Sequence, residues 1–293
     1  MSAKIGVWFM PEGIPAADSL AMAQRLEELG YDSLWIGEIF GRDPFAHLAF
    51  LGAGTQKLKL ATGIANIYNR HPGSMLQAAN TLAEQTGGRF TLGLGVSSPA
   101  IVQKIRGLDY SNPFRFLREF LEAMQGSRYI SIPPAEPVPV VLGVLLPRAL
   151  ALSAEKADGA HTYNVTPEHT ARAREILGEG KHLVVEQKVL LQEDPEKARE
   201  IAKKALAFYS RAPGYRKAWQ GMGFTEAQID NADPAWLDAI VAWGDEATIR
   251  ARIEAHVQAG ASEVLLHPLH PEMGMGLLDF ATLERFAPAG QDA

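Results

Sequence analysis

The chain has 293 residues, of which 47% are hydrophobic and 21% are charged, and its formal net charge is -6. This acidic balance argues against a nucleic-acid partner, because binding to phosphates requires a basic surface. The absence of cysteine excludes disulfides, zinc–thiolate sites and thiol catalysis.

The first residues read MSAKIGVWFMPEGIP and lack the basic and long apolar segments of a signal peptide. No run of apolar residues approaches the length of about 18 that a membrane-spanning helix needs. We therefore expect a cytoplasmic protein that has no membrane partner.

Short apolar runs bounded by turn residues predict eight strands. In chain order they cover residues 5–9, 33–36, 58–62, 90–94, 138–142, 159–162, 183–191 and 263–266. Because these runs are apolar throughout rather than alternating, they indicate a parallel sheet that is covered on both faces.

Helical patterns lie between the strands. In the first of them Met22, Leu26 and Leu29 share one face, and Gly30 ends the pattern. The other predicted helices cover residues 44–54, 74–86, 113–125, 148–156, 166–177 and 245–260. The region 194–243 is expected to be helical throughout, and it is longer than one connection between strands requires.

Eight strand–helix units predict a single domain over residues 1–293 with the α/β architecture of a (β/α)8 TIM barrel. The barrel carries insertions after strands four and seven. An open, doubly wound sheet is the competing topology, since the alternation of elements alone is compatible with both.

In a barrel the chemistry lies where the strands end. Glu38 follows the second strand and is a candidate acid or base, with a salt-bridged structural glutamate as the alternative. His71 follows the third strand and His267 ends the eighth, and both are further catalytic candidates. His267 and His270 have no third ligand at a matching spacing, so we predict no metal site.

Four segments resemble the bacterial luciferase-like family of flavin and deazaflavin oxidoreductases. They read EELGYDSLWIGEIFGRDPF (27–45), LATGIANIYNRHPGSMLQAANTLAEQTGGRFTLGLGVSS (60–98), PVVLGVLLPRALALSAEKADGA (139–160) and GASEVLLHP (260–268). The likeness covers most of the chain and is weakest over about 190–245. The most similar subgroup uses coenzyme F420, an 8-hydroxy-5-deazaflavin, and a sister subgroup uses FMN.

The resemblance implies an F420-dependent oxidoreductase that transfers a hydride between the cofactor and a small organic substrate. It also implies a homodimer and a cis peptide bond at Gly63–Ile64 in a bulge behind the cofactor ring. The implied cofactor-binding residues are Gly63, Ile64, Ala65 and Asn66, then Gly95, Val96, Ser97 and Ser98, then Gly143, Val144, Leu145 and Leu146.

Two positions depart from the family pattern. Many F420 enzymes carry a histidine after the strand-two carboxylate, where this chain has Ile39. The strand-five loop is often Gly-Pro-Arg, whereas here it is Leu145-Leu146-Pro147-Arg148. An FMN-dependent luciferase-like monooxygenase and a non-catalytic flavin- or ligand-binding relative are therefore the alternative functions.

Overall fold

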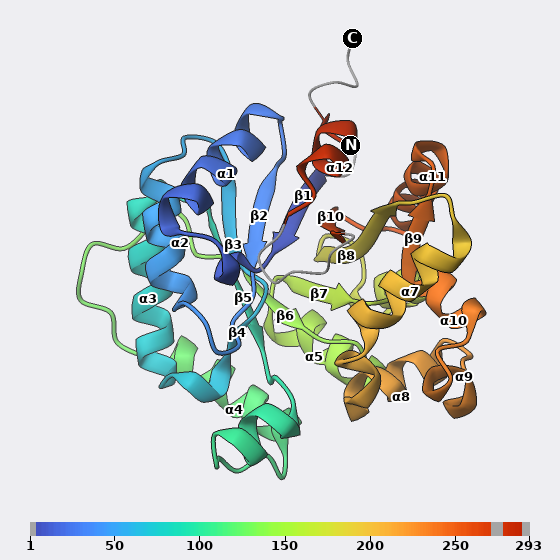
Figure 1. Ribbon diagram of the computed structural model, residues 1–293. Helices are drawn as coiled ribbons and strands as arrows, with labels where there is room; N and C mark the ends of the chain where they lie inside the picture. The colour runs from blue at the N-terminus through green and yellow to red at the C-terminus, as the bar shows by residue number, and fades with distance from the viewer. Residues whose placement is uncertain (1–3, 271–277, 289–293) are drawn as a thin grey trace.

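The computed structural model describes residues 4–270 and 278–288, in which eight parallel strands close into a barrel (Figure 1). The barrel strands are β1 (Lys4–Phe9), β2 (Ser33–Ile36), β3 (Lys59–Thr62), β5 (Phe90–Gly95), β6 (Val140–Gly143), β7 (Gly159–Tyr163), β8 (His182–Leu191) and β10 (Glu263–Pro268). β10 pairs with β1 on one side and with β8 on the other, which closes the sheet. The predicted barrel is confirmed, and the open sheet is excluded.

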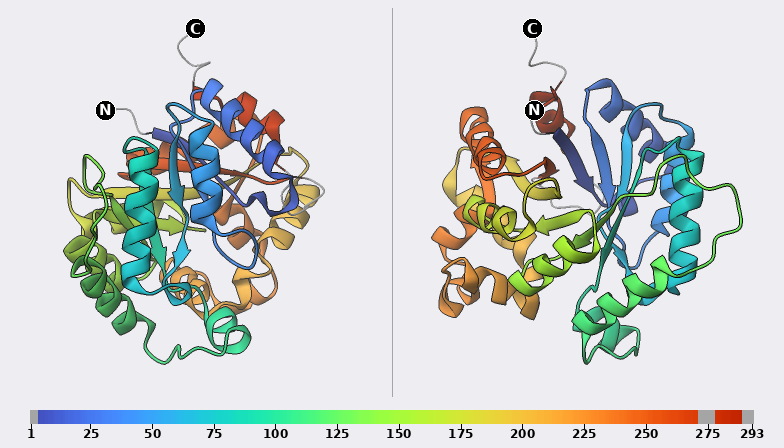
Figure 2. Two further views of the ribbon diagram at one scale, coloured as in Figure 1. Left: turned by 90° about the vertical axis from the view of Figure 1, so that its left-hand side faces the viewer. Right: turned by 180° about the vertical axis from the view of Figure 1, so that it is seen from behind.

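Helices surround the barrel in all three views (Figures 1 and 2). They are α1 (Ala16–Glu28), α2 (Pro44–Ala53), α3 (Pro72–Gln85), α4 (Pro113–Gln125), α5 (Pro147–Lys156), α6 (Pro167–Leu177), α11 (Glu246–Gln258) and α12 (Phe280–Arg285). Several begin with a capping side chain followed by proline, as Thr166 and Pro167 do at α6, where the Thr166 hydroxyl accepts a hydrogen bond from the His169 amide.

The region after β8 forms a second group of elements that lies together on one side of the barrel (Figure 1). It contains α7 (Pro195–Leu206), a short 3-10 turn (Tyr209–Arg211), α8 (Pro213–Gly221), α9 (Glu226–Asp230) and α10 (Pro234–Ile240). Trp219 and Trp236 are buried in its own apolar cluster, with their ring centroids 4.9 Å apart.

The prediction of continuous helix to residue 243 is wrong, because β9 (Val241–Gly244) follows α10 as a strand. β8 is longer than its neighbour β7, which pairs only with His182–Glu186. β9 pairs with the remaining part of β8, from Lys188 to Leu191. The four residues VAWG thus satisfy backbone groups that β7 does not reach.

Two irregular segments lie at the carboxyl ends of the strands. After β3, the two-residue strand β4 (Ala65–Asn66) pairs with the end of β5 and leads into a 3-10 turn (Ile67–Asn69). After β5, the chain passes through a π-helix (Ala100–Ile105) before α4 begins. In the right-hand view of Figure 2 this second segment extends past the end of the barrel beside α4.

Side chains fill the inside of the barrel. The buried residues that pack there are Trp8, Trp35, Ala61, Val141, Tyr163, Val184 and Leu265. A larger apolar cluster lies between the strands and the surrounding helices. The filled interior leaves the carboxyl end of the barrel as the place for a site. None of the helices in the described ranges is both long and apolar enough to cross a membrane.

Candidate active site

One half of the barrel mouth is lined by glycine. Gly37, Gly63, Gly95 and Gly143 stand at the ends of four neighbouring strands, β2, β3, β5 and β6. The Ile64 side chain occupies the space that the missing side chains of Gly95 and Gly143 leave. A Cβ on Gly95 would lie 2.6 Å from Ile64 Cδ1, and a Cβ on Gly143 would lie 2.9 Å from Ile64 Cγ2. These residues form an apolar surface, which we call the glycine floor.

The peptide bond between Gly63 and Ile64 is cis, which confirms the prediction from the sequence. Two hydrogen bonds hold Gly63 in place. Its amide donates to the Ile36 carbonyl over 2.7 Å, and its carbonyl accepts from the indole Nε1 of Trp8, also over 2.7 Å. A Cβ at position 63 would lie 2.9 Å from that indole nitrogen, so the close approach requires glycine.

Glu38 lies beside this floor in a network with Arg70 and Asn66. Arg70 Nη1 donates to both carboxylate oxygens, over 2.7 and 2.9 Å, and the Asn66 amide donates to Oε2 over 2.8 Å. Arg70 also pairs with Asp43 at the start of α2. Only 9% of the Glu38 side chain is exposed, so both of its oxygens are committed to partners within the protein.

The opposite half of the mouth is polar and is formed by β7, β8 and β10. Lys188 Nζ donates to Glu186 Oε1 over 2.8 Å and to the Asn164 side-chain oxygen over 2.7 Å. His267 Nδ1 lies 2.7 Å from the same Glu186 oxygen. The Tyr163 hydroxyl lies 2.9 Å from that of Tyr209 and 3.3 Å from His267 Nδ1.

This polar half contains a buried ion pair. Burial alone would raise the pKa of Glu186, but the charge of Lys188 and the hydrogen bonds from His267 and Lys188 hold it at about 2. Burial lowers the pKa of Lys188, and the Glu186 carboxylate opposes that shift. Asn164, which accepts from Lys188, has a backbone φ of 57°, a conformation that asparagine tolerates better than most residues.

The two loops expected to hold the cofactor phosphates end neighbouring strands, β5 and β6. In the first, Ser97 has a φ of 59°, and the Tyr110 hydroxyl donates to its carbonyl over 3.1 Å. In the second, the Val144 amide donates to the His161 carbonyl, and the ring of His169 on α6 contacts the Leu145 carbonyl over 2.8 Å. Both loops therefore have a fixed backbone.

Other predicted residues have mainly local roles. His71 is exposed and caps α3, because its Nδ1 accepts from the Gly73 amide. The Asn66 side-chain oxygen accepts from the Tyr68 amide in the 3-10 turn. In residues 4–270 and 278–288, no three His, Asp or Glu side chains gather in a way that could hold a metal ion.

Sequence reasoning missed Glu186 and Lys188. The signal was available in the strand sequence HLVVEQKVLL, where two ionisable residues stand two apart within an apolar run. Because alternate residues of a strand point to the same face, that spacing places both side chains on one side of β8. The neighbouring strand positions Tyr163 and His267 lie on the same inner surface, as the contacts show.

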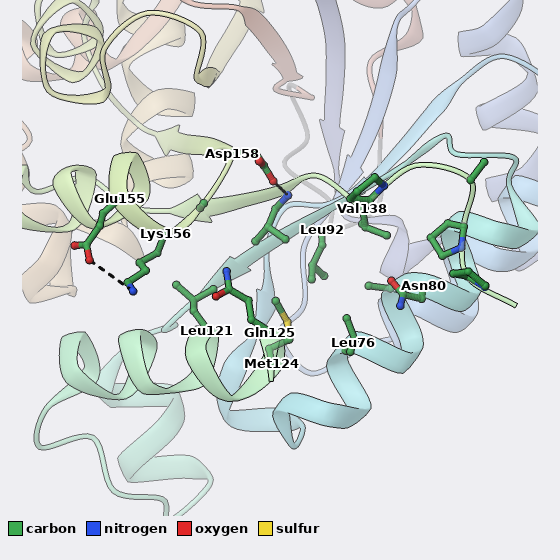
Figure 3. Close-up of a pocket in the computed structure, with 17 residues that line it drawn as sticks. Leu76, Asn80, Leu92, Leu121, Met124, Gln125, Val138, Glu155, Lys156 and Asp158 are labelled. Carbon is green, nitrogen blue, oxygen red and sulfur yellow. Dashed lines mark hydrogen bonds and ion pairs between the residues drawn. The ribbon is translucent and has the colours of Figure 1, made fainter. Parts of the chain in front are cut away.

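A cavity of about 720 Å³ lies elsewhere, on the outside of the barrel between α3, α4 and the segment before β6 (Figure 3). Leu76 and Asn80 from α3 face Leu121 and Met124 from α4 across it. None of the predicted site residues lines this cavity. It therefore lies apart from the barrel mouth.

Comparisons with known proteins agree with this architecture. Residues 1–263 match a family described as luciferase-like monooxygenase. A Mycobacterium tuberculosis protein, provisionally named a coenzyme F420-dependent oxidoreductase, is 28% identical over 196 residues, which are 57% of this chain and 56% of that protein. The 5,10-methylenetetrahydromethanopterin reductase of Methanolobus tindarius is 28% identical over 171 residues, 53% of this chain and 52% of that enzyme. The chain thus spans about half the length of these two relatives.

Solved structures share the whole fold. The coenzyme F420-dependent tetrahydromethanopterin reductase from Methanopyrus kandleri has a TM-score of 0.73 at 20% identity, and the alignment covers 94% of this chain and 97% of that one. An FMN complex of the oxygenating constituent of 3,6-diketocamphane monooxygenase from Pseudomonas putida has a TM-score of 0.72 at 15% identity, with 98% and 97% covered. At these identities the likeness establishes the fold.

Proposed function

We propose that this chain, which belongs to the luciferase-like monooxygenase family, is an oxidoreductase that uses coenzyme F420 and a small organic substrate. Two curated relatives support this assignment. One is provisionally named a coenzyme F420-dependent oxidoreductase, and the other is named 5,10-methylenetetrahydromethanopterin reductase. When bound, the deazaflavin would supply the acceptor or donor of a hydride.

The glycine floor is the observation that carries the proposal. A flat tricyclic ring needs a level apolar surface. The glycines at the ends of β5 and β6 let the Ile64 side chain lie down against the strands, and those at the ends of β2 and β3 add no side chain of their own. Alanine at Gly95 or Gly143 would collide with Ile64. The residues present therefore fit a planar cofactor at the barrel mouth.

The neighbouring loops would hold the rest of the cofactor. We assign its phosphate-bearing chain to Gly95–Ser98 and to the turn Gly143–Leu146, which lie side by side at the ends of β5 and β6. Backbone amides in such turns are suited to anions. Asn66 and Ala65, directly after the cis bond, border the ring site.

The protein's own part is to orient the two reactants and to manage a proton. Glu38, His71 and His267 are the candidate acid or base groups. Glu38 is engaged by Arg70 and by the Asn66 amide, and His71 caps α3 at the surface. His267 lies directly at the polar half of the mouth.

An FMN-dependent monooxygenase is the second candidate function. It is favoured by the FMN-containing structure, whose TM-score of 0.72 nearly equals that of the F420-dependent reductase. Such an enzyme would require molecular oxygen, whereas a deazaflavin enzyme would not.

The resemblance to the family implies a homodimer, and we propose one for this chain. Sedimentation equilibrium would test this oligomeric state.

Titration with each cofactor tests the proposal. We expect F420 to bind the wild-type protein and Gly95→Ala to weaken that binding about tenfold, since the added methyl must displace Ile64 at a cost of about 1–3 kcal/mol. Fluorescence titration measures the affinity. Gly214→Ala is the matched control, because a Cβ there meets no atom within 4 Å.

Three results would contradict the F420 assignment. Tight binding of FMN with no binding of F420 would favour the monooxygenase. Turnover that depends on oxygen would do the same. Binding of neither cofactor would favour a non-catalytic relative. An unchanged affinity of Gly95→Ala for F420 would show that the cofactor ring does not rest on the glycine floor.

A further inference from the structure

We propose that His267 is the residue that exchanges a proton with the substrate, and that Glu186 and Lys188 are positioning residues that keep its imidazole in the reactive form. This inference rests on the proposed function, because it assigns the proton that accompanies hydride transfer.

The strand register brings the three side chains together. His267 on β10 pairs with Lys188 on β8, and Leu265 pairs with Glu186. The side chains of Glu186 and Lys188 are 0% and 1% exposed, whereas that of His267 is 18% exposed. His267 is therefore the member of this trio that a molecule in the barrel mouth can reach.

The carboxylate selects the tautomer of the imidazole. Glu186 is ionised and can only accept a hydrogen bond, so the contact of 2.7 Å requires the proton of a neutral His267 ring to lie on Nδ1. The lone pair is then on Nε2. The same pairing of carboxylate and imidazole orients the base in hydrolytic triads.

The surrounding groups keep the imidazole neutral. Burial lowers the pKa of His267, the charge on Lys188 lowers it further, and Glu186 opposes both. The hydroxyls of Tyr163 on β7 and Tyr209 on the 3-10 turn complete this side of the site. On β1, the uncharged ring of Trp8 lies 4.6 Å from the imidazole, centroid to centroid.

The chemistry that fits is interconversion of an alcohol and a carbonyl compound. As an alcohol is oxidised, its C–H bond would break, and the bound deazaflavin would supply the acceptor for the hydride and both of its electrons. The O–H proton passes to His267 Nε2 and a C=O bond forms. The resulting imidazolium lies beside the positive charge of Lys188, which favours release of the proton to solvent. Reduction of the carbonyl runs through the same transfers in reverse.

The free protein allows a test that does not depend on activity. We expect nitrogen-15 NMR to show His267 as the neutral Nδ1–H tautomer at pH 7, its signal identified by its loss in His267→Gln. Lys188→Met should raise the pKa of His267, since it removes a neighbouring positive charge. A wild-type ring that is protonated at pH 7, or that carries its proton on Nε2, would overturn the proposal.

Kinetics then test the proton transfer itself. His267→Gln should lower kcat by about 10²–10⁴-fold with the affinity for F420 unchanged. His182→Gln is the matched control, because that histidine is exposed at the opposite end of β8. In the wild-type protein, kcat for alcohol oxidation should fall at low pH, because a protonated His267 cannot accept the substrate proton. Glu186→Gln should shift this pH profile, which a merely structural role would not do.

The outcomes separate the two proposals. If F420 binds and is turned over but His267→Gln loses less than about tenfold in kcat, the proton assignment is wrong while the proposed function stands. If F420 does not bind the wild-type protein, the proposed function fails and the assigned reaction fails with it. The NMR result for the tautomer remains decisive for the Glu186–His267 pair in either case.

Discussion

Glu38 joins the end of β2 to the bulge after β3 through two kinds of partner. The Arg70 guanidinium contacts both carboxylate oxygens, and the Asn66 amide contacts one of them. Because Asn66 lies two residues after the cis bond, this network fixes the edge of the glycine floor. The carboxylate thus has a structural task whether or not it also handles a proton.

Glu38→Gln separates these two roles. The amide cannot accept from Arg70 and Asn66 as a carboxylate does, so we expect the free energy of unfolding to fall by about 1–3 kcal/mol. Turnover per folded molecule should stay similar. A urea titration gives the stability, and a cofactor titration gives the concentration of competent sites.

A different result would make Glu38 the acid or base. In that case kcat per folded molecule would fall by about 10²–10⁴-fold with cofactor affinity retained. Glu12→Gln is a useful comparison, since the Glu12 carboxylate also accepts a backbone amide, from Arg42, but lies outside this network.

The residues of the site differ in how far the sequence reveals them. Gly63 and Ile64 could be predicted because the motif around them is specific. Glu186 and Lys188 could not be assigned a role from one strand alone, since their partners Asn164 and His267 lie 22 or more residues away in sequence. Their pairing depends on which strands become neighbours in the closed barrel.

At the scale of elements, α6 supports the turn after β6. The ring of His169 on α6 bonds to the Leu145 carbonyl over 2.8 Å, across 24 positions of the sequence. The helix itself is fixed by the Thr166 cap and by Thr170, whose hydroxyl lies 2.9 Å from His256 Nδ1 on α11. The turn that we propose for the cofactor phosphates, which has no glycine at positions 145 and 146, thus gains rigidity from a neighbouring helix.

His169→Leu should therefore loosen this turn. The Leu145 carbonyl loses its donor, and we expect a loss of about 1 kcal/mol in stability together with faster amide exchange over Gly143–Leu146. Hydrogen exchange measured by mass spectrometry reports both the site and the extent. His169→Gln can still donate to the carbonyl and is the control. Equal exchange in both variants would mean that the turn does not depend on this bond.

The strand pattern was easier to predict than the connections. The eight barrel strands are apolar runs bounded by turn residues, and the structure has a strand at each of them. β9 was missed because Val241–Gly244 directly follows the helix Pro234–Ile240 and has no turn signal before it. Val241–Gly244 forms a strand because residues 188–191 of β8 extend beyond β7 and are free to pair on that side. This is a property of the assembled sheet.

For the whole molecule, buried histidines make the fold sensitive to acid. Burial lowers the pKa of His161 to about 4 and that of His256 to about 3. In the unfolded chain a histidine has a pKa of about 6.5, so below that pH the unfolded state binds protons that the folded state does not. The free energy of unfolding should therefore fall as the pH falls from about 6.5 toward these values.

The expected slope is up to about 1.4 kcal/mol per pH unit for each such histidine. Urea unfolding at pH 7, 6 and 5 measures it. His256→Gln retains groups that can form hydrogen bonds with Thr170 and Gln187. The change of its free energy of unfolding with pH should be smaller by the contribution of one histidine. Stability that is constant between pH 7 and 5 would show that these side chains are not held neutral.

The division of the barrel mouth into a glycine floor and a polar half has a stereochemical consequence. A planar ring resting on Ile64 would have one face covered by that side chain, so the reacting carbon could be approached only from the opposite face. The two prochiral hydrogens at that carbon would then be chemically distinct to the protein. Deuterium delivered from a labelled substrate should accumulate in a single configuration at the cofactor, and the same deuterium should be the one removed in the reverse direction.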